Sequence, residues 1–196
     1  MVELCRLMLS CALEDLRGWR GPVVLVPEDR GDIDWARSLP AMRSDRRAPV
    51  KVLAQGAGNL GRRLERLDRA LGAMPFKRRI YIGSDAPVLK PRHYRRAIAG
   101  LARNDAVLAA ARDGGVTMMA TRRDWPPLAG LPWGTQGLAH ALSAACRKAG
   151  QKALRIPGGF DVDRRSDLAP LARALCGDAR PARRELHRWL VLNRLA

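Results

Sequence analysis

The sequence has no long apolar run, few aromatic residues and few acidic ones. No stretch approaches the roughly 20 apolar residues that a helix needs to cross a bilayer. The N-terminal segment is typical of an amphipathic helix with an early glutamate, not of a secretory signal. We therefore predict a cytoplasmic protein without a transmembrane segment. Aromatic residues make up only 5% of the chain and do not alternate with the basic ones, as a stacking surface for nucleic acid requires.

The four cysteines and three histidines lack the spacing of a metal site. Cys5, Cys11, Cys146 and Cys176 form no Cys-x-x-Cys pair, and each lies among apolar residues of an expected helix. The histidines are scattered along the chain. Because a zinc site needs close pairs of ligands, we predict reduced, buried thiols and no zinc.

Charge of one sign dominates the composition. The 196 residues include 36 Lys+Arg and only 19 Asp+Glu, which gives a net charge of +17. Such an excess occurs in proteins that bind nucleic acid, anionic lipid or phosphorylated substrates. Here it is nearly all arginine, is spread along the chain and accompanies abundant alanine, as GC-rich codon usage would produce. We favour a solvated basic surface over a specific nucleic-acid face.

Helix and strand patterns alternate along the chain, which predicts an α/β fold with a mainly parallel sheet flanked by helices. We expect strands at 22–27, 50–54, 79–83, 106–110, 116–121 and 153–156, and helices at 4–18, 32–39, 60–71, 91–103, 136–148, 166–175 and 182–195. The strand at 79–83 is expected to be central. Residues 113–115 join two strands and suit a hairpin turn.

The length suits a single domain. We expect it to span 1–176, with a basic amphipathic helix in the remaining segment, 177–196. Packing of this helix on the domain is the expected arrangement. An oligomer contact, or adhesion to anionic lipid, is the alternative.

Two groups of carboxylates follow expected strands. Asp85 comes directly after the apolar strand at 79–83, and ligands of open α/β sheets bind at the C-terminal ends of strands. Asp161 and Asp163 share one face of an extended segment, and paired acids repel unless a cation or donor lies between them. Both groups therefore suit a divalent cation. The alternatives are that Asp85 and Asp163 cap turns or helices and that Asp161 pairs with an arginine.

Two glycine-rich turns are further candidates. The segment 55–61 leads from a strand to a helix, as phosphate-binding turns do, but it has no Walker lysine and is weak as a dinucleotide motif. The glycines of 113–115 allow a ligand to approach the backbone closely.

Five segments together resemble the bacterial glycosyltransferase-A-like proteins grouped as domain-of-unknown-function family 2064, which include transferases assigned to arsenosugar biosynthesis. The resemblance extends from about Leu4 to Leu171. It is carried, in the family's order, by Gln55-Gly-Ala-Gly-Asn-Leu-Gly-Arg-Arg63, Ile82-Gly-Ser-Asp-Ala-Pro87, Asp113-Gly-Gly115, Trp133-Gly-Thr135 and Asp161-Val-Asp163 with Asp167-Leu168. Each segment alone is a weak signal, and their common order is the stronger one.

The resemblance implies a nucleotide-diphospho-sugar transferase (GT-A) fold, related to molybdopterin guanylyltransferases and phospholactate guanylyltransferases. It implies that Asp85 binds Mg²⁺ or Mn²⁺ after the central strand, and that Asp161 or Asp163 supplies the second metal-binding acid. The nucleotide and substrate positions that it implies are Gln55, Gly56, Asn59, Arg62, Ser84, Asp85, Asp113, Gly114, Gly115, Trp133 and Thr135.

The sequence departs from the family's pattern in several places. Family members open with a strand and a loop rich in Pro, Gly, Lys, Thr and Arg that contacts the nucleotide phosphates, whereas this sequence opens with the helix that would follow. The resemblance thus implies a sheet without its first strand, either because the start codon is placed too late or because the chain is a shortened relative. Asn59 stands where aspartate is usual, Ala86 where serine is usual and Val116 where tyrosine is usual.

Two functions are compatible with these residues. The first is a metal-dependent glycosyltransferase or nucleotidyltransferase acting on a nucleotide-activated sugar or a nucleoside triphosphate, with cationic help from Arg62, Arg63 or Arg112. The second is a catalytically degenerate domain that serves as a binding or scaffold protein and forms a homo-oligomer or another complex through helix 182–195. A nucleic-acid-binding protein would rest on charge alone.

Overall fold

The structure, a computed structural model, describes residues 2–39 and 49–195. Its helices are α1 (Val2–Arg17), α2 (Ile33–Ser38), α3 (Leu60–Gly72), α4 (Pro91–Gly100), α5 (Leu138–Lys148), α6 (Leu168–Leu175) and α7 (Pro181–Leu192). Its strands are β1 (Val23–Leu25), β2 (Val50–Val52), β3 (Arg79–Ile82), β4 (Ala106–Ala111), β5 (Val116–Thr121) and β6 (Ala153–Gly159). Each strand and helix expected from the sequence is present, with shifts of a few residues at the ends.

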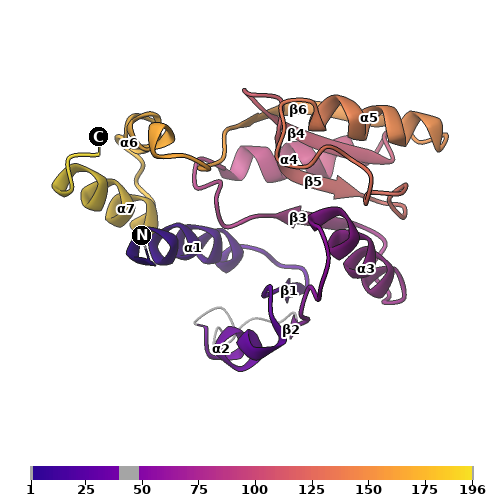
Figure 1. The fold of residues 1–196 in the computed structure, drawn as a ribbon, viewed down its shortest axis with the longest axis horizontal. Coiled ribbons are helices and arrows are strands. Elements are labelled where there is room, and N and C mark those ends of the chain that lie inside the picture. The colour runs from indigo at the N-terminus through magenta and orange to yellow at the C-terminus, as the bar shows by residue number, and fades with distance from the viewer. Residues whose placement is uncertain (1, 40–48, 196) are drawn as a thin grey trace.

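The strands form two sheets (Figure 1). β3, β5, β4 and β6 make a four-stranded sheet in that order, and β1 pairs with β2 in parallel. β6 is parallel to β4, whereas β5 is antiparallel to both β3 and β4. The α/β class with flanking helices is confirmed. The sheet, however, is mixed and not mainly parallel, because the turn at 113–115 returns the chain directly and a direct return can only pair antiparallel.

The expectation that strand 79–83 is central is wrong. β3 is the edge strand of the four-stranded sheet, because β5 lies between it and β4. Within residues 2–39 and 49–195, β1 pairs only with β2, so the two sheets are not joined by hydrogen-bonded strands.

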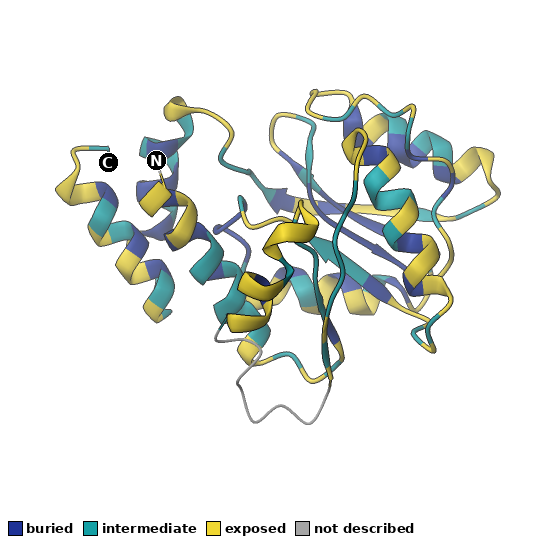
Figure 2. Ribbon diagram, turned by 60° about the horizontal axis from the view of Figure 1, so that its bottom comes forward, coloured by how far each residue is buried: buried dark blue, intermediate teal, exposed yellow. Residues whose placement is uncertain are grey.

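The four-stranded sheet has a hydrophobic core on each face. Successive strand residues point to opposite faces, and β4 is apolar throughout because both faces are covered. Val107 and Ala109 pack with Leu101 at the end of α4, whereas Leu108 packs with Leu142 and Cys146 of α5. Figure 2 shows buried residues in dark blue along the strands of the sheet and on the inner sides of the helices that cover it. The two layers fix the strands whose ends carry the candidate site.

A third core joins the two ends of the chain. Leu7 of α1, Leu171 of α6, and Leu186 and Leu190 of α7 are almost fully buried in one cluster. Figure 1 shows α1, α6 and α7 together beside the sheet. α7, which lies within the segment expected to be a C-terminal helix, packs against α1 and α6. The division into a domain at 1–176 and an added helix remains a prediction.

The thiols are only partly as expected. Cys11 and Cys146 are buried, and burial raises their pKa values to about 12 and about 11. Cys5 and Cys176 are exposed, so the prediction that all four are buried is wrong for these two. Each lies on the outward side of its helix or turn, a feature that local apolar composition does not reveal. In the described ranges, no helix is both long and apolar enough to span a membrane.

Candidate functional site

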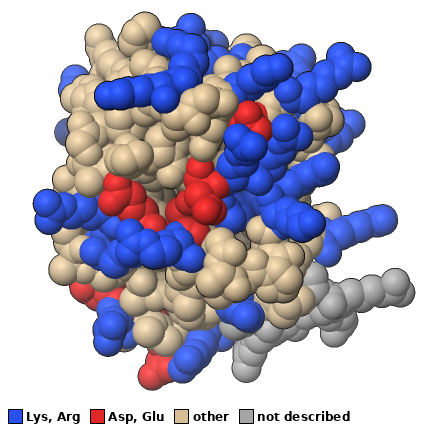
Figure 3. All heavy atoms as spheres, turned by 90° about the vertical axis from the view of Figure 1, so that its right-hand side faces the viewer, with Lys and Arg blue, Asp and Glu red and all other residues tan. Residues whose placement is uncertain are grey.

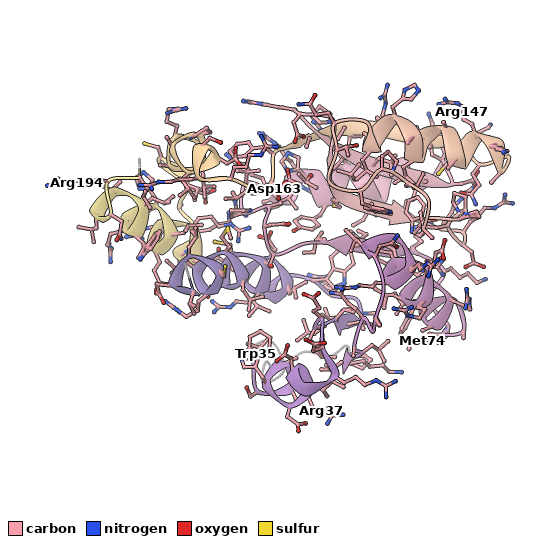
Figure 4. All side chains as sticks on the ribbon, viewed as in Figure 1. Trp35, Arg37, Met74, Arg147, Asp163 and Arg194 are labelled. Atoms are coloured by element: carbon pink, nitrogen blue, oxygen red, sulfur yellow. The ribbon has the colours of Figure 1, made fainter. Side chains whose placement is uncertain are left out.

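The C-terminal ends of three strands meet at one edge of the four-stranded sheet. β3 and β4 both run antiparallel to β5 and hence in the same direction, and β6 is parallel to β4. The segments that follow these strands carry Asp85, Asp113, Asp161 and Asp163. We call these four residues the acid edge. Figure 4 places Asp163 at the end of the sheet that faces α6 and α7.

Backbone contacts hold Asp85 in place. The Val162 N–H donates to the Asp85 carbonyl over 2.9 Å, which ties the segment after β3 to the segment after β6. The Asp85 carboxylate folds back over Gly83, so a Cβ at position 83 would overlap it. Gly83 therefore allows the conformation that Asp85 adopts. Ser84, the other candidate here, is exposed and borders a small gap shared with Arg183.

Asp167 organises the turn that carries Asp163. Its carboxylate accepts hydrogen bonds from the backbone N–H groups of Asp163, over 3.0 Å, and of Arg164, over 2.7 Å. The capping role considered for Asp163 thus belongs to Asp167, and the Asp163 side chain remains free for other contacts. A carboxylate four residues after another one, just before a helix, is a signal that sequence reasoning could have used for this role.

Two carboxyl groups of the acid edge, those of Asp85 and Asp161, have raised pKa values. Burial raises the pKa of the Asp85 carboxyl above its ordinary value and the charge of Asp163 raises it further, while a bond from its own backbone N–H opposes both. Burial is also the largest cause of the raised pKa of Asp161, with smaller contributions from Asp163, Asp113 and Asp85. These carboxylates therefore lie near enough to repel one another, as expected of a site that binds a cation.

No arginine relieves this repulsion in the described part of the chain. None of the four acids takes part in an ion pair there. The alternative in which Asp161 pairs with an arginine is therefore wrong. In a chain with 36 Lys+Arg, acids left without a basic partner point to a binding role more than to a structural one.

The turn at 113–115 packs against the start of α5. Asp113 accepts a hydrogen bond from the Gly115 N–H over 3.0 Å, and the Ala139 N–H donates to the Gly114 carbonyl over 2.9 Å. Gly114 has a φ of +94°, and a Cβ added there would overlap the backbone of Gln136. Gly115 lies beside Asp161, with 3.9 Å from an ideal Cβ to the carboxylate. The structure therefore brings Asp113, Gly114 and Gly115 to the acid edge, together with Gln136, which sequence reasoning missed.

The glycine-rich turn at 55–59 forms a different group. Asn59 caps α3, because its side chain accepts from the Arg62 N–H over 2.9 Å. The Arg66 guanidinium fills the turn by donating to the carbonyls of Gln55 and Ala57. The Gln55 amide donates to the Val26 carbonyl, so Gln55 and Gly56 hold local structure. Arg62 is exposed, whereas Arg63 pairs with Glu28 at 2.5 Å.

Loop 124–134 packs against α3 beside this turn and then continues along the chain to Thr135 and Gln136 near the acid edge. Glu65 on α3 accepts from the N–H groups of Leu128 and Ala129, and the Trp133 indole donates to the Leu128 carbonyl over 2.8 Å. Thr135 donates to the Pro132 carbonyl over 2.8 Å. The structure thus places Trp133 against α3 and Thr135 just before Gln136. Glu65 gave no sequence signal, since it resembles any solvated helix glutamate.

The carboxylates of the acid edge would suit a metal ion that is also held by substrate oxygens better than an ion whose ligands all come from the protein. Among the residues that the structure describes, no group of three or more His, Cys, Asp or Glu is placed to hold a metal ion. Mg²⁺ is commonly held by one or two carboxylates together with phosphate oxygens and water. Two of the three predicted ligands, Asp85, Asp161 and Asp163, would be enough for that arrangement. The metal itself stays a prediction.

The fold is that of an α/β protein of the nucleotide-diphospho-sugar transferase type. The structure superposes on a crystal structure from Desulfovibrio desulfuricans, described as a "putative nucleotide-diphospho-sugar transferase", with a TM-score of 0.76 and 24% identity over 98% of this chain and 83% of that one. The chain belongs to the family described as uncharacterized proteins conserved in bacteria (DUF2064), whose model matches residues 10–135. A search of curated proteins gives no match.

Proposed function

We propose that this protein is a metal-dependent transferase that acts on a nucleotide-activated sugar or a nucleoside triphosphate at the acid edge. The similar structure bears the name of such a transferase, and the fold is shared. One observation carries the proposal: Asp85, Asp161 and Asp163 come from distant parts of the chain, repel one another and have no basic partner in the described ranges.

A divalent ion bound here would neutralise a diphosphate and stabilise the charge that develops on the leaving group. The chain's own contribution is to hold the ligands in place. The bond from Val162 fixes the backbone of Asp85, and Asp167 fixes the turn of Asp163. The turn at 113–115 lies beside Asp161 and packs against Gln136, which holds this side of the acid edge in place.

Replacing Asp85 by asparagine is expected to abolish stabilisation by ligand. For the wild type, Mn²⁺ with a UDP-, GDP- or dTDP-sugar at about 100 times its Kd would add about 2.7 kcal/mol, or roughly 5–10 °C in Tm. D85N should show almost none of this shift, because it lacks a charged ligand for the ion. Thermal unfolding measures both. D29N, on an exposed turn, is the matched control and should behave as wild type. If no ligand shifts the wild type, or D85N shifts equally, the proposal fails.

Without metal, D85N is expected to be more stable than the wild type at pH 7 and equally stable near pH 4. The native pKa of Asp85 is raised, so the native protein binds this proton more readily than the unfolded chain. The ionised carboxylate therefore destabilises the native state above its native pKa, and this cost disappears as pH falls toward its unfolded value. Thermal unfolding in EDTA at both pH values measures the difference. A D85N variant that is less stable than the wild type at pH 7 would contradict this account.

A binding or scaffold role is the second candidate. Val191 and Leu192 at the end of α7 are 49% and 75% exposed, and Val2 at the start of α1 is 86% exposed. These apolar side chains favour a contact with another protein or a second copy of the chain. A folded wild type that none of the metal–nucleotide combinations stabilises is the result expected for this function.

A further inference from the structure

A groove of about 700 Å³ lies away from the acid edge. Its walls come from the end of α3, the α3–β3 connection, the start of β3, the segment after β5, and Gln151 shortly before β6. Figure 4 shows Met74 well away from Asp163, which lies near the middle of the molecule between the sheet and helices α6 and α7. The groove therefore belongs to the N-terminal edge of the sheet and plays no part in the proposed transferase site.

Two arginines of the groove are held by one buried carboxylate. Asp105 accepts from Arg122, with 3.1 Å to Nε, and lies 3.6 Å from Nε of Arg123. Asp105 also accepts from the Lys152 N–H and is only 10% exposed, whereas the Arg122 and Arg123 side chains are 42% and 60% exposed. The guanidiniums are thus anchored on their inner side. Among the described residues, the Nη groups of Arg123 have no partner and present N–H donors to solvent.

The remaining charges leave the groove with a positive excess. Arg79 is neutralised by Asp68, at 3.1 Å, and by Asp124, at 3.0 Å. Asp124 is the one carboxylate among the groove's lining residues, and it is occupied by this pair. Lys77 has no acidic partner in the described ranges. Figure 3, which faces this end of the molecule, shows Lys and Arg side chains surrounding a few central carboxylates.

The shape of the groove and its donors define the ligand. Anchored guanidiniums bind oxyanions at low entropic cost, since their planar donor fork is already oriented. The groove has the volume of a small-ligand site, and half-buried Met74 and Phe76 give it an apolar wall. We infer that it binds a phosphate group through Arg122, Arg123 and Lys77, either as inorganic phosphate or as the phosphate of a nucleotide whose base packs on the apolar wall.

Titration calorimetry in EDTA tests this inference without any contribution from metal at the acid edge. Inorganic phosphate and AMP are titrated into the wild type, K77Q, R122Q and R123Q. Each groove variant should bind at least about tenfold more weakly, because each loses a charge-assisted hydrogen bond to the phosphate. AMP binding more tightly than phosphate identifies a nucleotide as the ligand, and equal affinities identify free phosphate.

The controls separate a site from general positive charge. K51Q removes an exposed lysine on β2 and should leave binding unchanged, and so should D85N. R122Q also removes a partner of buried Asp105, so K77Q, which breaks no ion pair, carries the test if R122Q unfolds. The inference is overturned if the wild type binds neither ligand at millimolar concentration, or if K51Q weakens binding as much as K77Q. Failure here leaves the transferase proposal untouched, because that proposal depends on different residues.

Discussion

Replacing Arg183 by methionine is expected to lower the free energy of unfolding by about 3–5 kcal/mol. The Arg183 side chain on α7 is 1% exposed and lies 2.9 Å from Glu14 and 2.8 Å from Asp15, both on α1. Its guanidinium also donates to the carbonyls of Cys11 and Pro87. The variant would leave two nearly buried carboxylates with too few donors, a far larger cost than any gain from the apolar replacement.

Urea unfolding measures this loss, with R184M as the matched control. Arg184 is the next residue and is exposed, so its replacement should change stability by less than about 0.5 kcal/mol. Adding E14Q to R183M should restore part of the stability, because Glu14 has no ion-pair partner besides Arg183 in the described ranges, whereas Asp15 keeps Arg180 at 3.0 Å. A loss below about 1 kcal/mol in R183M would show that the buried network is not what holds α7 to α1. The Pro87 carbonyl follows Asp85 closely, so the same variant also tests whether α7 supports the acid edge.

Replacing Gly114 by alanine is expected to cost about 2–5 kcal/mol. Two effects add: a side chain at φ +94° is strained by about 1–2 kcal/mol, and overpacking a closed contact costs about 1–3 kcal/mol. The new Cβ would overlap the Gln136 carbonyl oxygen and lie 2.8 Å from the carbonyl carbon. Both groups are backbone, so neither can rotate away.

The G150A variant isolates the first of these effects. Gly150 also has a positive φ, +70°, but no atom lies within 4 Å of an ideal Cβ there. In urea unfolding, the stability lost by G150A therefore measures the backbone strain alone. The stability lost by G114A measures the strain together with the clash. G114A should be the less stable by at least about 1 kcal/mol, and it should also weaken ligand binding at the acid edge by displacing Asp113 and Gln136. Equal losses in the two variants would mean that α5 yields to the new methyl group.

Local patterns were enough to place the helices and strands. β4 is continuously apolar, β5 follows after Asp113-Gly-Gly115, and Pro91 marks the first turn of α4. Each of these signals acts over a few residues, because it reflects backbone preference or the burial of one face. The order of the strands in a sheet is not set by such local signals. Nothing local in Ile80 or Ile82 reveals that β5 pairs with β3 and leaves β3 at the edge.

In the candidate site, too, some features could be predicted from local sequence and others could not. The positions of Asp85, Asp161 and Asp163 after strands predicted their shared edge, since the ends of strands that run in one direction meet there. The roles of Asp167 and Glu65 were not predictable in the same way. Each accepts backbone N–H groups from a segment whose position depends on how the loops cross.

The sequence by itself determined the class of fold, the chain positions of the acids and the excess of basic charge. These follow from composition and from the periods of helix and strand. Only the tertiary structure decided which of the acids lack a basic partner, that Arg183 is buried against α1, and that Arg122 and Arg123 share one carboxylate. Such pairings join residues from distant parts of the chain, and an arginine-rich sequence offers far more candidate partners than any one fold uses.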